Sequence, residues 1–277
     1  MSNQFKLGCD PEFFLFNKET GCIESAHDLV PGSKGIPYKL TYGGVLSDGV
    51  AVEFNIDPAE SAEVFEININ HTLKEIRALV PAKYKFEYKS TAVFKGDYWK
   101  DLPNTAKEIG CDPDFNAFTG NRASRSPKDG IRHAGGHIHV GWRDPTDITP
   151  SHLWDAKYIC RQMYYSFARL FNTFQKEDYE RQYDVPKSVF RPKPYGAEFR
   201  GLSNLWLGYP KLYSYIFNTC KKAYERTLEG LELNELYQYS YLNDGYFDYK
   251  SYHAKALKKL GMEDIPSDWR THGQSVS

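Results

Sequence analysis

Two histidines separated by one residue occupy the segment GGHIHVGW at 135–142. Because side chains alternate between the two faces of a β-strand, His137 and His139 would share one face while the apolar residues between them face a core. The neighbouring glycines leave the backbone accessible to a phosphate, a metal ion or another chain segment. A histidine pair of this kind also occurs as a purely structural feature, so its interpretation depends on what other strands present.

Three other segments repeat the i, i+2 spacing with polar groups. The pairs are Asp10 and Glu12, Glu53 and Asn55, and Glu198 and Arg200. Same-face neighbours on a strand lie roughly 7 Å apart and adjacent strands about 4.8 Å apart, so one sheet made of these segments would present a carboxylate-rich surface. Oxygen ligands with one or two imidazoles suit Mg²⁺ or Mn²⁺, and Mg²⁺ is commonly bound together with substrate phosphates. The pattern therefore indicates a site for a metal ion and a nucleotide.

Arginines near these segments predict contacts to phosphate. Arg200 would place a guanidinium beside the metal ions, where it can neutralise charge on a phosphoryl group during transfer. Arg191, in the segment FRPKPYG at 190–196, is a candidate contact for a second phosphate. The polar loop at 119–133 is interpreted either as a solvated loop or as a flap that binds anions, and its arginines are Arg122, Arg125 and Arg132. A carboxylate, a metal ion and an arginine together are the parts that in-line phosphoryl transfer requires.

Hydrophobic periodicity predicts the elements that position these groups. Strict alternation predicts strands at about 4–16, 50–56, 83–94, 135–142 and 195–202. A repeat of three to four residues predicts helices over about 58–80, 153–174 and 210–228. The segment GCDPDFNAF at 110–118 nearly repeats GCDPEFFLF at 8–16, which makes Asp112 and Asp114 further site candidates. We expect a single α+β domain over residues 1–277, with a core at about 4–228 and a helical or loop extension at 229–277.

The composition excludes several classes of partner. With 35 basic and 36 acidic residues the net charge is −1, so neither nucleic acid nor a membrane is expected as the main partner. Five cysteines without a CxxC pair argue against a disulfide framework and against a cysteine zinc site. The chain begins without a signal-peptide pattern and has no apolar stretch of membrane-spanning length. A cytoplasmic location is therefore expected.

At these residues the sequence resembles the carboxylate–amine ligase superfamily, which is built on the catalytic sheet of glutamine synthetase and glutamate–cysteine ligase, and in particular phage-type amidoligases. The resemblance covers residues from about 5 to 225. It implies metal ligands at Asp10, Glu12, Glu53, His137 and Glu198, and contacts to ATP phosphates from His139, Arg191 and Arg200. The family usually has two glutamates in its first metal-binding pair, so Asp10 is a departure that puts its direct metal contact in question.

The resemblance also implies a fold and a reaction. The fold would be a curved, mainly antiparallel sheet with helices packed on its convex face. The reaction would use ATP and Mg²⁺ (or Mn²⁺) to join a carboxylate to an amine through an acyl phosphate, with Arg200, Glu198 and His139 as catalytic residues. Arg132, from the polar loop at 119–133, is a further candidate contact to the nucleotide. Asp112, Asp114 and a loop residue are alternatives for the general base.

The same residues are compatible with several substrates and with two other reaction classes. Small-molecule or peptide carboxylates and amines are expected substrates, the protein is expected to be a monomer or a homodimer, and a phage-encoded enzyme would act in the host cytoplasm. Two other functions compete with the ligase. They are a metal-dependent hydrolase that uses the histidine and carboxylate residues without ATP, and a catalytically inactive binding module on the same fold.

Overall fold

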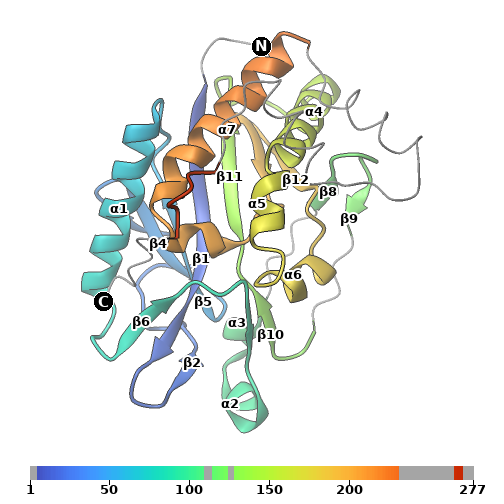
Figure 1. The fold of residues 1–277 in the computed structure, drawn as a ribbon. Helices are drawn as coiled ribbons and strands as arrows, with labels where there is room; N and C mark the ends of the chain where they lie inside the picture. The colour runs from blue at the N-terminus through green and yellow to red at the C-terminus, as the bar shows by residue number, and fades with distance from the viewer. Residues whose placement is uncertain (1–4, 109–113, 124–127, 231–264, 271–277) are drawn as a thin grey trace.

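The computed structural model describes residues 5–108, 114–123, 128–230 and 265–270. The described residues form an α+β fold with an 11-stranded sheet, a two-stranded sheet and seven α-helices (Figure 1). The strands are β1 (Lys6–Asn17), β2 (Cys22–Glu24), β3 (Tyr38–Leu40), β4 (Gly43–Asp48), β5 (Ala51–Ile56), β6 (Tyr84–Glu87), β7 (Thr91–Val93), β8 (Asp114–Asn116), β9 (Arg122–Ala123), β10 (Ile131–His133), β11 (Gly136–Gly141), β12 (Val189–Lys193) and β13 (Gly196–Phe199). The helices are α1 (Ala62–Leu79), α2 (Gly96–Asp101), α3 (Asn104–Lys107), α4 (Pro150–Ser166), α5 (Ala168–Thr173), α6 (Tyr179–Asp184), α7 (Lys211–Leu228) and the 3₁₀-helix η1 (Asn204–Gly208).

The large sheet is built around β1. Its strands follow the order β3-β4-β5-β1-β11-β13-β12-β8-β9, and β2 and β6 pair with the far end of β1. Neighbouring strands run antiparallel, and the path has two ends, β3 and β9, so the sheet is open. These features confirm the predicted α+β class and the mainly antiparallel sheet.

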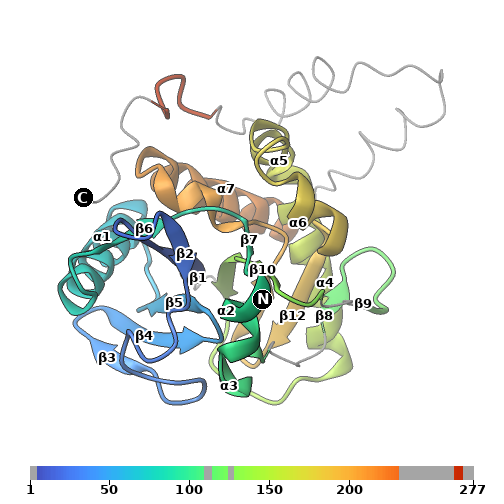
Figure 2. The same ribbon diagram turned by 90° about the horizontal axis from the view of Figure 1, so that it is seen from below.

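Helices α1, α7 and α4 cover one face of this sheet (Figure 2). The alternation predicted for the strands places Phe13, Phe54, Ile138 and Phe199 in the same core as apolar residues of the three helices. Burial of this face stabilises the fold, because each large apolar side chain removed from water contributes about 1.5–3 kcal/mol. Polar residues that alternate with these core residues must therefore lie on the opposite face of the sheet.

Three predicted elements differ from those observed. The helix expected from residue 58 begins at Ala62, because Ser61 caps it by accepting a hydrogen bond of 3.2 Å from the backbone of Val64. The helix expected over 153–174 is divided at Phe167 into α4 and α5. The strand expected over 83–94 forms β6, which pairs with β1, and β7, which pairs with β10. Ser90, between these two strands, is buried, and its hydroxyl donates to the backbone carbonyl of Glu177. At this residue the chain passes from the large sheet to the two-stranded sheet.

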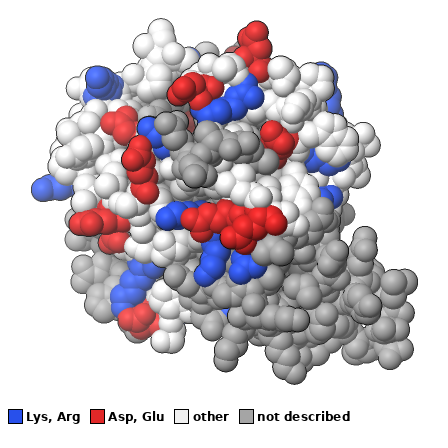
Figure 3. Space-filling view, turned by 90° about the horizontal axis from the view of Figure 1, so that it is seen from above, with Lys and Arg blue, Asp and Glu red and all other residues white. Residues whose placement is uncertain are grey.

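The surface carries charges of both signs. On the face seen in Figure 3, acidic and basic side chains are interspersed among uncharged ones, in line with the net charge of −1. Within the described ranges, no helix is both long enough and apolar enough to cross a membrane. Asp112, Arg125 and most of the predicted C-terminal extension lie outside the described residues.

Candidate functional site

The register of β1 sets the arrangement of the predicted acidic residues. Asp10 lies opposite His137 of β11, and Glu12 lies opposite Glu53 of β5. Pro11, between the two acids, points to the helix-covered face together with Cys9 and Phe13, and is buried. Asp10 and Glu12 therefore share the face that the helices leave open, as the alternation predicts.

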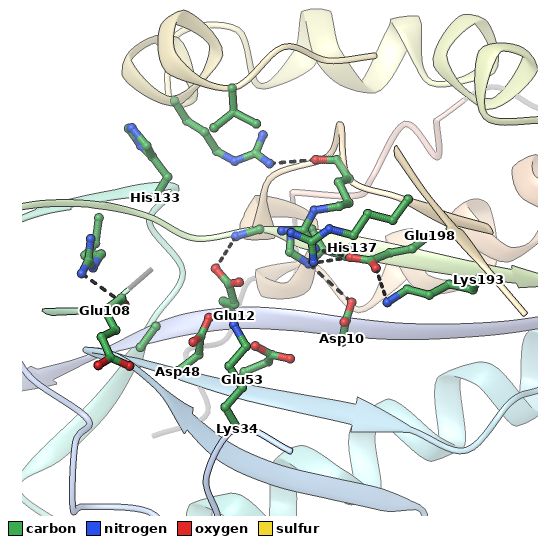
Figure 4. Close-up of a pocket in the computed structure, with 17 residues that line it drawn as sticks. Asp10, Glu12, Lys34, Asp48, Glu53, Glu108, His133, His137, Lys193 and Glu198 are labelled. Carbon is green, nitrogen blue, oxygen red and sulfur yellow. Dashed lines mark hydrogen bonds and ion pairs between the residues drawn. The ribbon is translucent and has the colours of Figure 1, made fainter. Parts of the chain in front are cut away.

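The next strands add an imidazole, a carboxylate and a guanidinium in one row. His139 lies opposite Glu198 of β13, and Glu198 in turn lies opposite Arg191 of β12. A polar pocket of about 230 Å³ opens on this face of the sheet (Figure 4). Eight of the predicted site residues line this pocket, namely Asp10, Glu12, Glu53, Arg132, His137, Arg191, Glu198 and Arg200, whereas His139 does not.

Three carboxylates on β1, β4 and β5 form what we call the acidic cluster, defined as Glu12, Asp48 and Glu53. One carboxylate oxygen from each lies within 4.8 Å of the others. Within the described part of the chain none of the three makes an ion pair, although Glu12 Oε2 accepts a hydrogen bond of 2.9 Å from the backbone of Gly135. Burial and the charge of Asp48 raise the pKa of Glu12 to about 7. Burial, followed by the charges of Asp10 and Glu12, also raises the pKa of Glu53 well above its ordinary value.

A second group, which we call the paired cluster, consists of Asp10, His139 and Glu198. Its potential ligand atoms also lie within 4.8 Å of one another. Asp10 Oδ1 lies 2.9 Å from His139 Nε2, and Glu198 binds both Arg200 and Lys193, the latter at 2.8 Å. Burial alone would raise the pKa of the Glu198 carboxyl, but Arg200 and the neighbouring histidines together outweigh it and hold this pKa well below its ordinary value. The paired cluster is thus already neutralised by the protein.

The two histidines occupy different electrostatic environments. Arg200 Nη1 lies 3.1 Å from His137 Nδ1, and because a guanidinium can only donate, that nitrogen accepts the hydrogen bond. Burial and the charge of Arg200 lower the pKa of His137 to about 4, so its imidazole is neutral. His139 is the opposite case, because the attraction of Asp10 outweighs burial and raises its pKa. His139, which the sequence assigns to phosphate, is thus the imidazole whose ligand atom is grouped with those of Asp10 and Glu198. His137, assigned to metal, also lies near these carboxylates, with Nδ1 3.5 Å from Asp10 Oδ1, but this nitrogen accepts from Arg200.

A glycine is required beside His137. A Cβ atom on Gly135 would lie 2.0 Å from Nε2 of the His137 imidazole, so any larger residue would displace this ring. The same Gly135 backbone donates to Glu12 and accepts from its N–H, which ties β1 to the start of β11. One residue therefore positions both a carboxylate and an imidazole.

Asp114, a candidate general base, holds two arginines instead. Its Oδ1 atom lies 2.8 Å from Nε of Arg191 and 3.1 Å from Nε of Arg200, and its side chain is 2% exposed. It does not line the pocket. The role that the geometry gives Asp114 is to orient the two guanidinium groups, since charge-assisted bonds of this kind fix side chains in place.

The arginines of the predicted flap separate in the structure. Arg132 lies at the edge of the pocket, where it donates to the backbone carbonyls of Lys107 and Glu108 and covers the ring of Trp99. Arg122 is exposed on β9 and does not line the pocket. Of the two described arginines, only Arg132 is placed to contact a ligand there.

Sequence reasoning did not identify three residues of the site. Asp48 precedes Gly49, which has a φ of +60°, so the pair has the pattern of a turn and gives no sign of a ligand. Lys193 lies between two prolines, and Tyr195 follows them. The hydroxyl of Tyr195 contacts His139 Nδ1, and Lys193 binds Glu198. Only strand pairing shows that these residues reach the site.

A second pocket of about 490 Å³ adjoins the first and shares Asp10 and Glu53 with it. Its other walls include His139, Tyr195 and apolar groups such as Ile56. The carboxylates of Asp10 and Glu53 therefore lie between a charged pocket and a more apolar one. Such an arrangement can bring a ligand with an apolar body and a charged end to the carboxylates.

Comparison with known proteins adds no family to this description. A scan against protein-family models finds no match, and a search of the curated proteins also finds none.

Proposed function

We propose that this protein is an ATP- and Mg²⁺-dependent ligase that joins a carboxylate to an amine through an acyl phosphate. The observation that carries the proposal is the placement of the acidic cluster beside the paired cluster on one open sheet face, with Arg191 and Arg200 next to them. Carboxylate oxygens are the ligands that Mg²⁺ prefers, and guanidinium groups bind phosphoryl oxygens. Each part of a phosphoryl-transfer site is thus represented by a described side chain.

The acidic cluster fits a divalent cation. Three carboxylates converge, and none of them has an ion pair with a cation among the described residues. Burial, followed by the repulsion of neighbouring carboxylates, raises the pKa values of Glu12 and Glu53. In this proposal Glu12, Asp48 and Glu53 would hold the Mg²⁺ ion. When bound, Mg²⁺ would supply positive charge to the phosphate oxygens and to the transferred group.

The arginines would bind the transferred phosphoryl group. Arg200 stays charged, because Glu198, Asp114 and Asp10 together outweigh the effect of burial and raise the pKa of its guanidinium further. Asp114 fixes both Arg191 and Arg200, so these donors are oriented before a ligand arrives. Preoriented charges stabilise a transition state without reorganisation during the reaction.

The fold type and the substrates belong to the same proposal. An antiparallel sheet with helices on one face and polar residues on the other supports a catalytic sheet of the glutamine synthetase type. The described sheet is open and not strongly curled, so the curvature of that type is not part of the support. The substrates would be a small-molecule or peptide carboxylate and amine, used in the cytoplasm by a monomer or homodimer.

Positional isotope exchange tests the proposal directly. ATP labelled with ¹⁸O at the β,γ-bridge should scramble its label in the presence of Mg²⁺ and a carboxylate, with no amine, because acyl phosphate formation is reversible. ADP should accumulate only when the amine is added. Arg200→Gln should abolish exchange, and Glu225→Gln, at an exposed pair on α7, should leave it unchanged. A protein that binds no Mg–ATP by calorimetry would refute the proposal.

A metal-dependent hydrolase is the second candidate. The observation that favours it is that the acidic cluster could hold a metal ion without any nucleotide. Turnover of a phosphoester or an amide without ATP, together with tight metal retention, would support the hydrolase over the ligase.

A further inference from the structure

The ligand atoms of the paired cluster already face protein N–H groups. Lys193 Nζ lies 2.8 Å from Glu198 Oε2, while Arg200 binds Glu198 Oε1 (Figure 4). His139 Nε2 lies 2.9 Å from Asp10 Oδ1. A metal ion at this cluster would have to displace these contacts before it could bind.

Formal charges near the paired cluster are balanced without a metal. Among the residues that the structure describes, three carboxylates are matched in number by three permanent cations. The carboxylates are Asp10, Asp114 and Glu198, and the cations are Arg191, Lys193 and Arg200. The acidic cluster, two residues further along β1, has three carboxylates and no ion pair among the described residues. Among the described residues, the carboxylates of one half of the site are therefore ion-paired with protein cations, and those of the other half are not.

Lys193 is held in position by its backbone. It is the last residue of β12, paired with Gly196 of β13, and it lies between Pro192 and Pro194, whose rings restrict the local backbone. Its side chain is 29% exposed and lines the polar pocket, so its ammonium group reaches Glu198 from the pocket side. The protein itself therefore supplies a positive charge to the site, through the Lys193 ammonium group.

We propose that the ammonium group of Lys193 takes the place of one divalent cation, so that the site binds a single metal ion, at the acidic cluster. The inference rests on the proposed function, because it specifies how a metal-dependent site is loaded. The repulsion between an ammonium group and a divalent ion is twice that between two monovalent ions at the same distance. Lys193 and Arg200 together would therefore exclude a metal ion from the paired cluster.

Metal stoichiometry tests this inference without any catalytic assay. Calorimetric titration of the full-length protein with Mn²⁺, in the absence of nucleotide, should give one site. Lys193→Met keeps the length of the side chain and removes its charge, and it should give two sites. Electron paramagnetic resonance should then show a broadened signal at two equivalents, because the spins of neighbouring Mn²⁺ ions couple.

Two matched variants serve as controls. Lys193→Arg retains a cation and should still give one site. Lys34→Met removes a cation that lines the same pocket but has no described ion pair with Glu198, and it should also give one site. Circular dichroism would establish that each variant folds.

Three results would overturn the inference. Two Mn²⁺ ions in the unmodified protein would show that Lys193 does not exclude a metal, and one ion in folded Lys193→Met would show that its charge is not the cause. Both results leave the ligase standing if ATP turnover requires a metal. No Mn²⁺ binding to any form would refute the single site and the metal-dependent function together.

Discussion

The acidic cluster and the paired cluster both start from β1, at Glu12 and Asp10, yet their neighbours give them opposite electrostatics. On one side β4 and β5 present Asp48 and Glu53 to Glu12, so like charges converge. On the other side Asp10 and Glu198 meet His139, Lys193 of β12, and Arg200, which follows β13. Two carboxylates on one strand thus have different electrostatic environments because the adjacent strands present different groups to them.

This difference in electrostatic environment predicts that the two clusters affect the stability of the fold in opposite ways. A buried carboxylate that is paired lowers the free energy of the folded state relative to an unpaired one, and the pKa falls accordingly. A buried carboxylate among like charges raises the free energy of the folded state until a cation binds. We therefore expect substitutions in the two clusters to change stability with opposite signs.

The largest effect is expected at Glu198, in the paired cluster. Glu198 is 1% exposed, and its carboxylate pairs with both Lys193 and Arg200. Glu198→Gln would leave these two cations without this negatively charged partner. Breaking a buried pair by removing one partner is expected to lower the free energy of unfolding by about 3–5 kcal/mol. Urea denaturation with EDTA present would measure this loss in the free energy of unfolding. A loss no larger than that of Glu225→Gln, where the surface pair with Lys221 is worth about 0–1 kcal/mol, would contradict the assignment.

The next effect is a pH dependence at Glu12, in the acidic cluster. Its pKa is raised in the folded protein to about 7, so its contribution to stability is present below about pH 4.5 and is lost as the pH rises to 7. His137 has a pKa lowered to about 4 and acts in the opposite direction, so the comparison must be made against Glu12→Gln. The stability of the protein relative to this variant should fall by about 3 kcal/mol between pH 4.5 and 7.5 without metal.

Saturating Mg²⁺ provides the control for this pH dependence. A bound cation favours the ionised carboxylate, so the fall in relative stability should largely disappear. A relative stability that does not change with pH in EDTA would show that Glu12 is not repelled by its neighbours.

A smaller effect of opposite sign is expected at Glu53. Glu53→Gln removes a charge from the acidic cluster, and at pH 8.5 in EDTA it should raise the free energy of unfolding by roughly 1–2 kcal/mol. The same variant should bind Mn²⁺ about 100-fold more weakly, because it loses a carboxylate ligand. Thermal denaturation and calorimetry on one sample would measure both. Destabilisation without metal would place Glu53 in a paired environment and remove the contrast between the clusters.

Sequence patterns predicted the parts of the site that depend on alternation. The period of two placed Asp10, Glu12, Glu53 and Glu198 on one face, because a strand fixes the direction of every side chain once its register is set. The same reasoning gave the α+β class and the antiparallel sheet. It also gave helices α1 and α7, whose apolar repeat covers the other face.

Partners across strands could not be predicted in the same way. Asp48 has the sequence context of a turn, and only the pairing of Leu46 with Glu53 brings β4 beside the site. The pairing of Lys193 with Glu198 depends on how far β12 extends beside β13. Asp114 appeared as a possible base because its two arginine partners lie 77 and 86 residues away along the chain. Long-range register decides which charges are neutralised, and sequence periodicity does not encode it.

The smallest effect is expected at Tyr195, whose hydroxyl contacts His139 Nδ1 on the side of the ring away from Asp10. Tyr195→Phe removes one hydrogen bond to the paired cluster while keeping the ring, so the free energy of unfolding should fall by about 1 kcal/mol. Tyr42→Phe is the matched control, because Tyr42 also contacts a histidine ring, His71, but on the exposed surface and through its edge. It should change stability by less than about 0.5 kcal/mol. Because the described hydrogen bond of the Tyr195 hydroxyl is to His139 of the paired cluster, Mn²⁺ affinity at the acidic cluster should be the same in both variants. A loss of affinity in Tyr195→Phe alone would show that the two clusters act as one unit.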